Sequence, residues 1–204
     1  MAVNTFTTIK NFITDTLEDD GISDAADNWI ALAEAKIYRW LRVSDMETAF
    51  SEAIASGVIN VPSDFKSWQS VWLDTNPIQE LEERSPAWIR SRYSDRSAGS
   101  KPLYIGKSAS TFIFGPYPDS NYTVAGVYYK SLTALSTSNE TNILTTDYPD
   151  LLMYAALRHS APYLGEDPRV TLWDGEYERL KNEIETEERN RRYGQRKSMA
   201  ARVQ

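Results

Sequence analysis

The spacing of apolar residues along this chain of 204 residues changes twice, from helical to strand-like and back to helical. Two segments near the start place an apolar residue every three or four positions, which is the pattern of an amphipathic helix. The first stripe consists of Phe6, Ile9, Ile13 and Leu17, and the second of Trp29, Ala33, Ile37, Trp40 and Leu41. Ser23 and Asp24 are suitable caps for the second helix. Because each helix has one apolar face, both must pack against another part of the chain.

From about Thr48 the pattern becomes that of β-strands. Short runs rich in β-branched and aromatic residues alternate with Pro, Gly, Asp and Asn, which favour turns. These runs read VINVP, SVWLD, PIQEL, PLYIG, TFIFG and NYTVAGVYYK. Ser85 followed by Pro86 is typical of a helix start and predicts a short helix from Pro86 to Tyr93. We therefore expect residues 46–133 to form a small antiparallel β region with one helix laid across it.

The helical pattern returns after this region. In the segment DYPDLLMYAALRHSAPYLG, Pro149 suits the first turn of a helix, and Pro162 and Gly165 are expected to end it. Asp167 and Pro168 then predict the start of a further helix. Its apolar residues are three and four positions apart in a coiled-coil-like seam, namely Val170, Trp173, Tyr177, Leu180 and Ile184.

The predicted fold class is α+β, with N- and C-terminal amphipathic helices forming a bundle and a small antiparallel β region inserted between them. Residues 1–45 hold the N-terminal helices, and residues 46–133 hold the β region with its short helix. Residues 134–188 hold the C-terminal helices, which are expected to pack on the N-terminal ones. Residues 189–204 form a basic C-terminal tail.

The sequence contains no signature of catalysis, cofactor binding or metal binding. It has no cysteine, which excludes disulfides, thiol catalysis and zinc sites built from cysteine. The motifs GxSxG, GxGxxG, HExxH and the P-loop are absent. The single histidine, His159, follows Arg158 near a predicted helix end, where a cation interacts favourably with the helix dipole. We predict that the protein is not an enzyme and has no cofactor or metal site. We also predict no secretion signal and no membrane span.

Charge is distributed unevenly along the chain. The last segment, RNRRYGQRKSMAARVQ, has six basic residues and no acidic one, although the net charge of the whole chain is −7. Without those six charges, the net charge of residues 1–188 is −13. A negative body repels phosphate backbones, so we do not expect the folded part to bind double-stranded DNA in general.

From Val61 to Leu180 the order of strands, turns and caps matches a known class of protein. The segments read VPSDF, SVWLD, SPAWIRSRY, GSKPLYIG, FIFGPYPDSNYTVAGVYYKSLTALS, TNILTTDYPDLLMYAALRHSAPYLGEDPR and LWDGEYERL. Together they resemble the head-to-tail adaptor (connector) proteins of short-tailed, podovirus-like tailed phages. The resemblance implies a virion structural protein that is assembled in the host cytoplasm. It also implies a ring, usually dodecameric, between the portal and the tail nozzle or tube, with double-stranded DNA passing through the lumen without sequence-specific binding.

The resemblance also suggests a role for the basic tail, because adaptors of this class reach the portal with C-terminal segments. The residues expected to bind the portal are Arg189, Arg191, Arg192, Tyr193, Arg196, Lys197 and Arg202. We expect the tail to be disordered or frayed in the isolated protein and to become ordered when it pairs with portal carboxylates. A solvated tail that only neutralises the preceding helix, or a tail that contacts DNA in the lumen, are the other interpretations.

Two other functions compete with the adaptor hypothesis. A nucleic-acid-binding protein that used the basic tail would show a DNA affinity that falls steeply with salt. A hydrolase based on carboxylates would need two acidic side chains in one cleft, and no motif in the sequence supports this.

Overall fold

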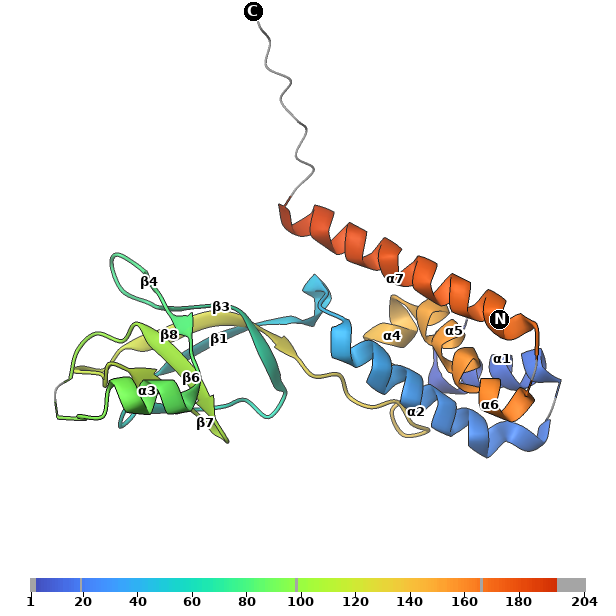
Figure 1. The fold of residues 1–204 in the computed structure, drawn as a ribbon, viewed down its shortest axis with the longest axis horizontal. Coiled ribbons are helices and arrows are strands. Elements are labelled where there is room, and N and C mark those ends of the chain that lie inside the picture. Colours follow the sequence, from blue (N-terminus) through green and yellow to red (C-terminus); the bar gives the residue numbers. More distant parts are fainter. Residues whose placement is uncertain (1–2, 19, 98, 166, 194–204) are drawn as a thin grey trace, which may run out of the picture. The chain divides into compact units, whose positions relative to one another are not determined.

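The chain folds into two compact units (Figure 1). The helical unit comprises Met1–Asp45 and Leu132–Gln204, and the β unit comprises Met46–Ser131. Helices and strands are thus largely segregated, which confirms the α+β fold class. The computed structural model describes residues 3–18, 20–97, 99–165 and 167–193.

The helical unit begins with a helix whose start is set by local hydrogen bonds. The backbone N–H of Thr8 donates to Oγ1 of Thr5 at 3.2 Å, and the N–H of Thr5 donates to Oγ1 of Thr8 at 2.9 Å. The helices of the unit are α1 (Phe6–Leu17), α2 (Ser23–Trp40), α4 (Ile143–Thr146), α5 (Pro149–His159), α6 (Ala161–Leu164) and α7 (Arg169–Tyr193). The short 3-10 turns are η1 (Asp20–Ile22) and η2 (Ser44–Met46). Because η1 runs directly into α2, Ser23 is already helical and is not the predicted cap.

The core of the helical unit surrounds α5, which contacts α1, α2, α4, α6 and α7 (Figure 1). Most of the predicted apolar stripes are buried there, including Ile9, Ile13, Ala33, Ile37, Trp173, Tyr177, Leu180 and Ile184. Burial of one large apolar side chain stabilises a fold by about 1.5–3 kcal/mol, so these stripes account for the packing of the helices. A polar contact joins α2 to α7, where Nε1 of Trp40 donates to the hydroxyl of Tyr177 at 3.1 Å.

The helix that begins at Pro149 is shorter than predicted. It ends at His159, and Ala161–Leu164 form the separate short helix α6, which is followed by Gly165. Pro162 has no N–H to donate to the preceding turn. Ser160 instead closes α5, because its hydroxyl donates to the carbonyl of Leu157 at 2.6 Å.

The β unit contains two four-stranded sheets. In the first, the order is β1 (Glu47–Ala53), β8 (Thr123–Lys130), β3 (Phe65–Leu73) and β4 (Gln79–Glu80). In the second, the order is β2 (Val58–Asn60), β7 (Thr111–Gly115), β6 (Tyr104–Ser108) and β5 (Glu82–Glu83). The helix predicted at Pro86 is α3 (Pro86–Arg92), and Ser85 caps it by accepting a hydrogen bond from the N–H of Trp88.

Strand pairing in the β unit joins distant parts of the chain. Glu47 on β1 lies opposite Tyr129 on β8, and 82 positions separate them in the sequence. Strand β1 was not among the predicted runs, because Phe50 is its only fully buried residue. The pairing is antiparallel except between β5 and β6, which run parallel. This parallel pair departs from the antiparallel region that the sequence predicted.

Both sheets contribute side chains to one core in the β unit. Phe50 of the first sheet and Phe112 of the second are buried there, and their ring centroids are 6.3 Å apart. Phe65 and Trp68 pack against the same cluster, each with its ring centroid 5.0 Å from that of Phe112. Edge-to-face and tilted contacts of this kind stabilise aromatic cores.

Candidate partner-binding site at the end of α7

The C-terminal end of α7 lies beyond the point at which the sequence predicted an unstructured tail. The helix continues through residues 189–193 and ends at Tyr193. Side chains one turn apart support this extension, since Nη1 of Arg191 is 3.0 Å from Oε1 of Glu188 and Nη2 is 3.6 Å from Oε1 of Glu187. The expectation of a disordered or frayed segment is therefore wrong for residues 189–193, because they are helical and Arg191 pairs with two glutamates of the preceding turn.

Glu188 is the centre of a polar contact that holds this helix end. It is only 6% exposed, although it is charged. Its Oε2 accepts a hydrogen bond from the backbone N–H of Ser44 at 3.0 Å, and both carboxylate oxygens are 3.3 Å from the hydroxyl of Ser44. A buried carboxylate must be hydrogen-bonded or paired, and Ser44 meets this need from the chain segment that follows α2.

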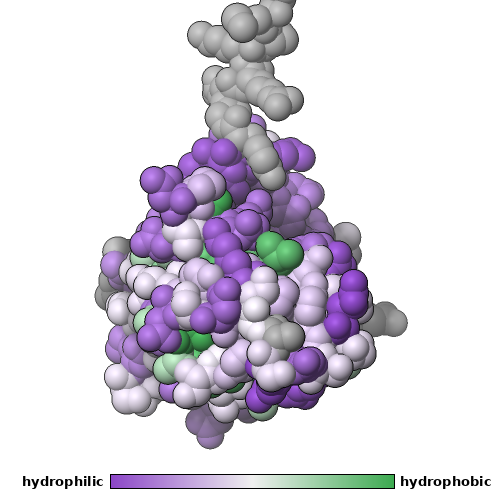
Figure 2. All heavy atoms as spheres, turned by 90° about the vertical axis from the view of Figure 1, so that its left-hand side faces the viewer, coloured by the Kyte–Doolittle hydropathy of each residue, from purple (hydrophilic) through white to green (hydrophobic). Residues whose placement is uncertain are grey.

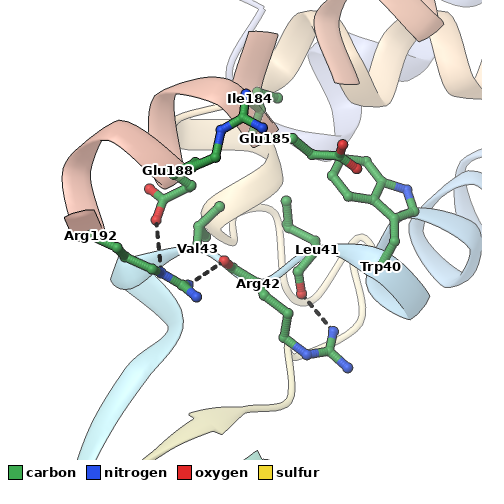
Figure 3. Close-up of a pocket in the computed structure, with 9 residues that line it drawn as sticks. Trp40, Leu41, Arg42, Val43, Ile184, Glu185, Glu188 and Arg192 are labelled. Carbon is green, nitrogen blue, oxygen red and sulfur yellow. Dashed lines mark hydrogen bonds and ion pairs between the residues drawn. The ribbon is translucent and has the colours of Figure 1, made fainter. Parts of the chain in front are cut away.

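The two arginines that follow complete the contact. Nη1 of Arg191 donates to the hydroxyl of Ser44 at 2.7 Å and to Oδ2 of Asp45 at 3.3 Å. Nη2 of Arg192 donates to the carbonyl of Arg42 at 2.6 Å, and its Nε is 3.9 Å from Oε2 of Glu188 (Figure 3). The last turn of α7 is therefore fixed to residues 42–45 by several charged hydrogen bonds.

The electrostatic effect of this cluster extends to Tyr148. Burial of its ring raises the pKa of Tyr148 to about 12, and the negative charges of Glu188 and Asp45 act in the same direction. Its hydroxyl therefore stays protonated at neutral pH and does not act as a base.

A pocket of about 200 Å³ lies beside the contact, between the end of α2 and α7 (Figure 3). It is smaller than the roughly 300–1,000 Å³ of a typical small-molecule site, so it suits a single side chain of a partner. Residues of three kinds form its wall. Aliphatic residues are Leu41, Val43 and Ile184, charged residues are Arg42, Glu185, Glu188, Arg189 and Arg192, and Trp40 closes one side.

The predicted partner-binding residues fall into four groups. Arg191 and Arg192 are occupied within the chain, whereas Arg189 is exposed beside the pocket and has one long hydrogen bond, 3.4 Å to Oγ1 of Thr186. Tyr193 is the last residue of α7. The others, Arg196, Lys197 and Arg202, lie outside the described residues. Sequence reasoning missed Ser44 and the burial of Glu188, although the spacing from Glu188 to Arg191 and Arg192 was a usable signal for helix continuation.

A second buried carboxylate, Glu34 on α2, has a structural role that the sequence did not reveal. Its Oε2 accepts from the N–H of Leu135 at 3.1 Å, and its Oε1 accepts from Nδ2 of Asn142 at 2.6 Å. Burial raises the pKa of Glu34 in spite of these two bonds. Asn142 also caps α4, so Glu34 fixes the segment that enters the C-terminal helices.

The described residues show no arrangement for metal binding, since no group of three or more His, Asp or Glu side chains converges. His159 is the last residue of α5, and burial, Lys36 and Arg158 all lower its pKa. It is therefore neutral at pH 7 and is not the cation that was expected at this helix end. Within the described part of the chain, none of the helices combines the length and the apolar character that crossing a membrane requires.

Comparison with known families supports one of the functions that the sequence left open. The chain matches the family model described as SU10 adaptor protein over residues 4–202. This chain belongs to the SU10 adaptor protein family. The match confirms the resemblance to phage adaptors, and it covers both the helical unit and the β unit. The search of curated proteins gave no match.

Family membership establishes the general function of this chain. The chain is a phage adaptor, and thus a structural component of the virion that associates with other virion components such as the portal and the tail. This role is structural rather than catalytic. The contact around Glu188 is then a candidate for positioning a partner-binding segment.

Proposed function

We propose that this adaptor forms a ring, dodecameric as is usual for the class, between the portal and the tail nozzle or tube of a short-tailed, podovirus-like phage. The C-terminal segment docks to the portal, and DNA passes through the lumen of the ring. The observation that carries the proposal is the contact of Glu188 with Ser44. It fixes the end of α7, so the basic segment that follows starts from a defined position.

The predicted residues are assigned two different roles in this proposal. Arg191 and Arg192 hold the end of α7 against residues 42–45. The portal-binding role then belongs to the exposed Arg189, to Tyr193 and to the residues that follow, Arg196, Lys197 and Arg202. Arginine and lysine pair with carboxylates, and a contact that is weak in one subunit is repeated around a ring.

The charge of the helical unit without its basic C-terminal segment supports passage of DNA without binding. Residues 1–45 and 132–188 contain 20 acidic and 8 basic residues, a net charge of −12. A lumen formed by such a surface repels phosphate groups and lets DNA move through the ring.

Two truncations test the docking role separately from the anchoring role. The full chain, a chain ending at Tyr193 and a chain ending at Glu188 are each mixed with the portal of the same phage, and the mass is measured by light scattering on a sizing column. We expect many copies on each portal ring for the full chain and none for the chain ending at Tyr193, which keeps the Glu188 contact but lacks the following basic residues.

The remaining outcomes separate the parts of the proposal. Equal portal binding by all three chains would refute docking through the C-terminal segment. Binding by the chain ending at Tyr193 but not by the one ending at Glu188 would assign docking to the helix end itself. Affinity of the full chain for duplex DNA that is lost in both truncations and falls steeply with salt would instead favour a nucleic-acid contact.

A further inference from the structure

Positive charge is also concentrated in one stretch of the β-unit sequence, separate along the chain from the basic residues 189–204. The β unit as a whole is nearly neutral, with 8 basic and 9 acidic residues. Residues 84–107 contain six of those basic residues and only one acidic residue, Asp95. This segment consists of α3, the loop after it and β6.

Helix α3 holds the segment on the second sheet. Its one buried side chain is Ile89, which packs where β6 and β7 carry glycine. A Cβ atom on Gly106 would come within 2.9 Å of Cδ1 of Ile89, and a Cβ on Gly115 within 2.8 Å of the ring of Tyr93. The close approach made possible by these glycines leaves Arg90 and Arg92 exposed on the outer side of the helix.

Aromatic rings lie beside the arginines on this surface. The ring centroids of Trp88 and Tyr104 are 4.9 Å apart, and those of Tyr93 and Tyr104 are 6.0 Å apart. The guanidinium of Arg92 lies 5.7 Å from the ring centroid of Tyr93, and that of Arg84 lies 5.5 Å from the ring centroid of Trp88. We call this surface the arginine face and define it by Trp88, Arg90, Arg92, Tyr93, Arg96 and Tyr104.

The cations of the arginine face have no acidic partner in the described part of the chain. Among the described residues, Arg90, Arg92 and Arg96 form no ion pair with a carboxylate, and Arg90 donates only to the hydroxyl of Ser108 at 2.9 Å. The arginines that lie along α7 differ, because Arg179 pairs with Glu176 and Glu183. The arginine face therefore offers charges that a partner can still neutralise.

We propose that the arginine face binds an acidic segment of another protein, with the guanidinium groups of Arg90, Arg92 and Arg96 gripping its carboxylates. Trp, Tyr and Arg are the residues most enriched at the energetic centres of protein interfaces. A guanidinium stacked on a ring keeps its planar fork oriented, which suits two-point binding of a carboxylate. Among the described residues, the side of the molecule seen in Figure 2 is mainly hydrophilic, and its hydrophobic residues lie in small separate groups.

Two observations favour an acidic protein over nucleic acid or a second copy of this chain. Bases bind proteins by stacking on open aromatic faces, but guanidinium groups already lie over Trp88, Tyr93 and Tyr117. In a second copy, many carboxylates of the acidic helix α7 already have arginine partners, as Asp174 and Glu178 have in Arg158.

The test uses the full chain and a fluorescein-labelled probe peptide of alternating Glu and Gly, with a Gln and Gly peptide as the uncharged probe. Fluorescence anisotropy at low salt should detect binding of the acidic peptide only. The double variant Arg92→Gln/Arg96→Gln should weaken binding about tenfold. The variant Arg92→Lys/Arg96→Lys keeps the positive charges but loses the two-point geometry of the guanidinium groups, and it should weaken binding about threefold. The control Arg39→Gln/Lys130→Gln removes two exposed charges elsewhere and should leave binding within about twofold.

Three results would overturn the proposal. In the first, the control variant weakens binding as much as the Arg92→Gln/Arg96→Gln variant, so only net charge matters. In the second, a single-stranded dT20 or a 20-base-pair duplex binds more tightly than the peptide, and the Arg92→Gln/Arg96→Gln variant loses that binding, which assigns the face to nucleic acid. In the third, sedimentation velocity shows wild-type self-association that this variant abolishes, which assigns the face to a second copy. All these variants keep residues 189–204, so their portal binding reports on the proposed docking function separately.

Discussion

Replacement of Glu188 by alanine should selectively destabilise the helical unit and release the end of α7. The side chain is buried and accepts from the backbone N–H of Ser44 at 3.0 Å. Without it, that N–H and the hydroxyl of Ser44 lose their carboxylate acceptor, and Arg191 and Arg192 lose their ion pairs with Glu188.

The size of the effect follows from the contacts. A hydrogen bond to a charged group contributes about 1.5–3 kcal/mol, and a partly buried donor left without an acceptor costs about 1–3 kcal/mol. The pair with Arg191 adds little, because that side chain is 45% exposed and screened by water. We expect Glu188→Ala to lower the free energy of unfolding by about 3 kcal/mol. Glu188→Gln should lower it by only about 1 kcal/mol, since the amide oxygen can still accept from Ser44.

Urea unfolding followed by circular dichroism at 222 nm measures this effect, because all helices except α3 belong to the helical unit. A loss of about 3 kcal/mol shifts the midpoint by roughly 1.5 M urea for a slope near 2 kcal/mol/M. Hydrogen exchange should rise in peptides that cover residues 40–46 and 184–193. Glu185→Ala is the matched control, since Glu185 is exposed on the same helix. The reasoning fails if the Glu188→Ala and Glu185→Ala chains unfold within about 0.5 kcal/mol of each other.

Two further predictions concern a buried acid and a central strand. Because burial raises the pKa of Glu34 above its ordinary 4.5, the folded chain binds this proton more tightly than the unfolded chain. The stability that Glu34 contributes is then fully present below pH 4.5 and is lost as pH rises through the pKa of the folded state. Relative to Glu34→Gln, the wild-type chain should therefore become less stable on going from pH 4.5 to 7. Parallel pH profiles of the two chains would contradict this. Gly126→Ala should destabilise the β unit by about 2 kcal/mol, because its Cβ would lie 2.7 Å from the carbonyl oxygen of Ser70. Gly175→Ala on α7, where the added Cβ would meet no atom outside its own helix backbone within 4 Å, should be neutral or slightly stabilising. Tryptophan fluorescence during urea unfolding compares the two variants.

The candidate site could be predicted only in part. The excess of arginine near the C-terminus was visible in the sequence, and Arg189, Arg191 and Arg192 do lie together at the end of α7. The sequence did not show which of these arginines contact the rest of the chain, because those contacts depend on Ser44, which is 144 positions from Glu188. The arginine face was not predicted, because the negative charge of the whole chain drew attention away from the basic residues 84–107 in a nearly neutral unit.

The sequence by itself determined the α+β class, the identity of most helices and the resemblance to phage adaptors. Amphipathic spacing, caps and prolines act over a few residues, so Ser85 and Pro86 start α3 wherever that helix is later packed. Only the tertiary structure decided the pairing of β1 with β8, the parallel pair of β5 and β6, and the burial of Glu34 and Glu188. These features depend on partners far away in the chain. A strand with one buried residue, or a glutamate on a helix, carries no local signal of the group that will satisfy it.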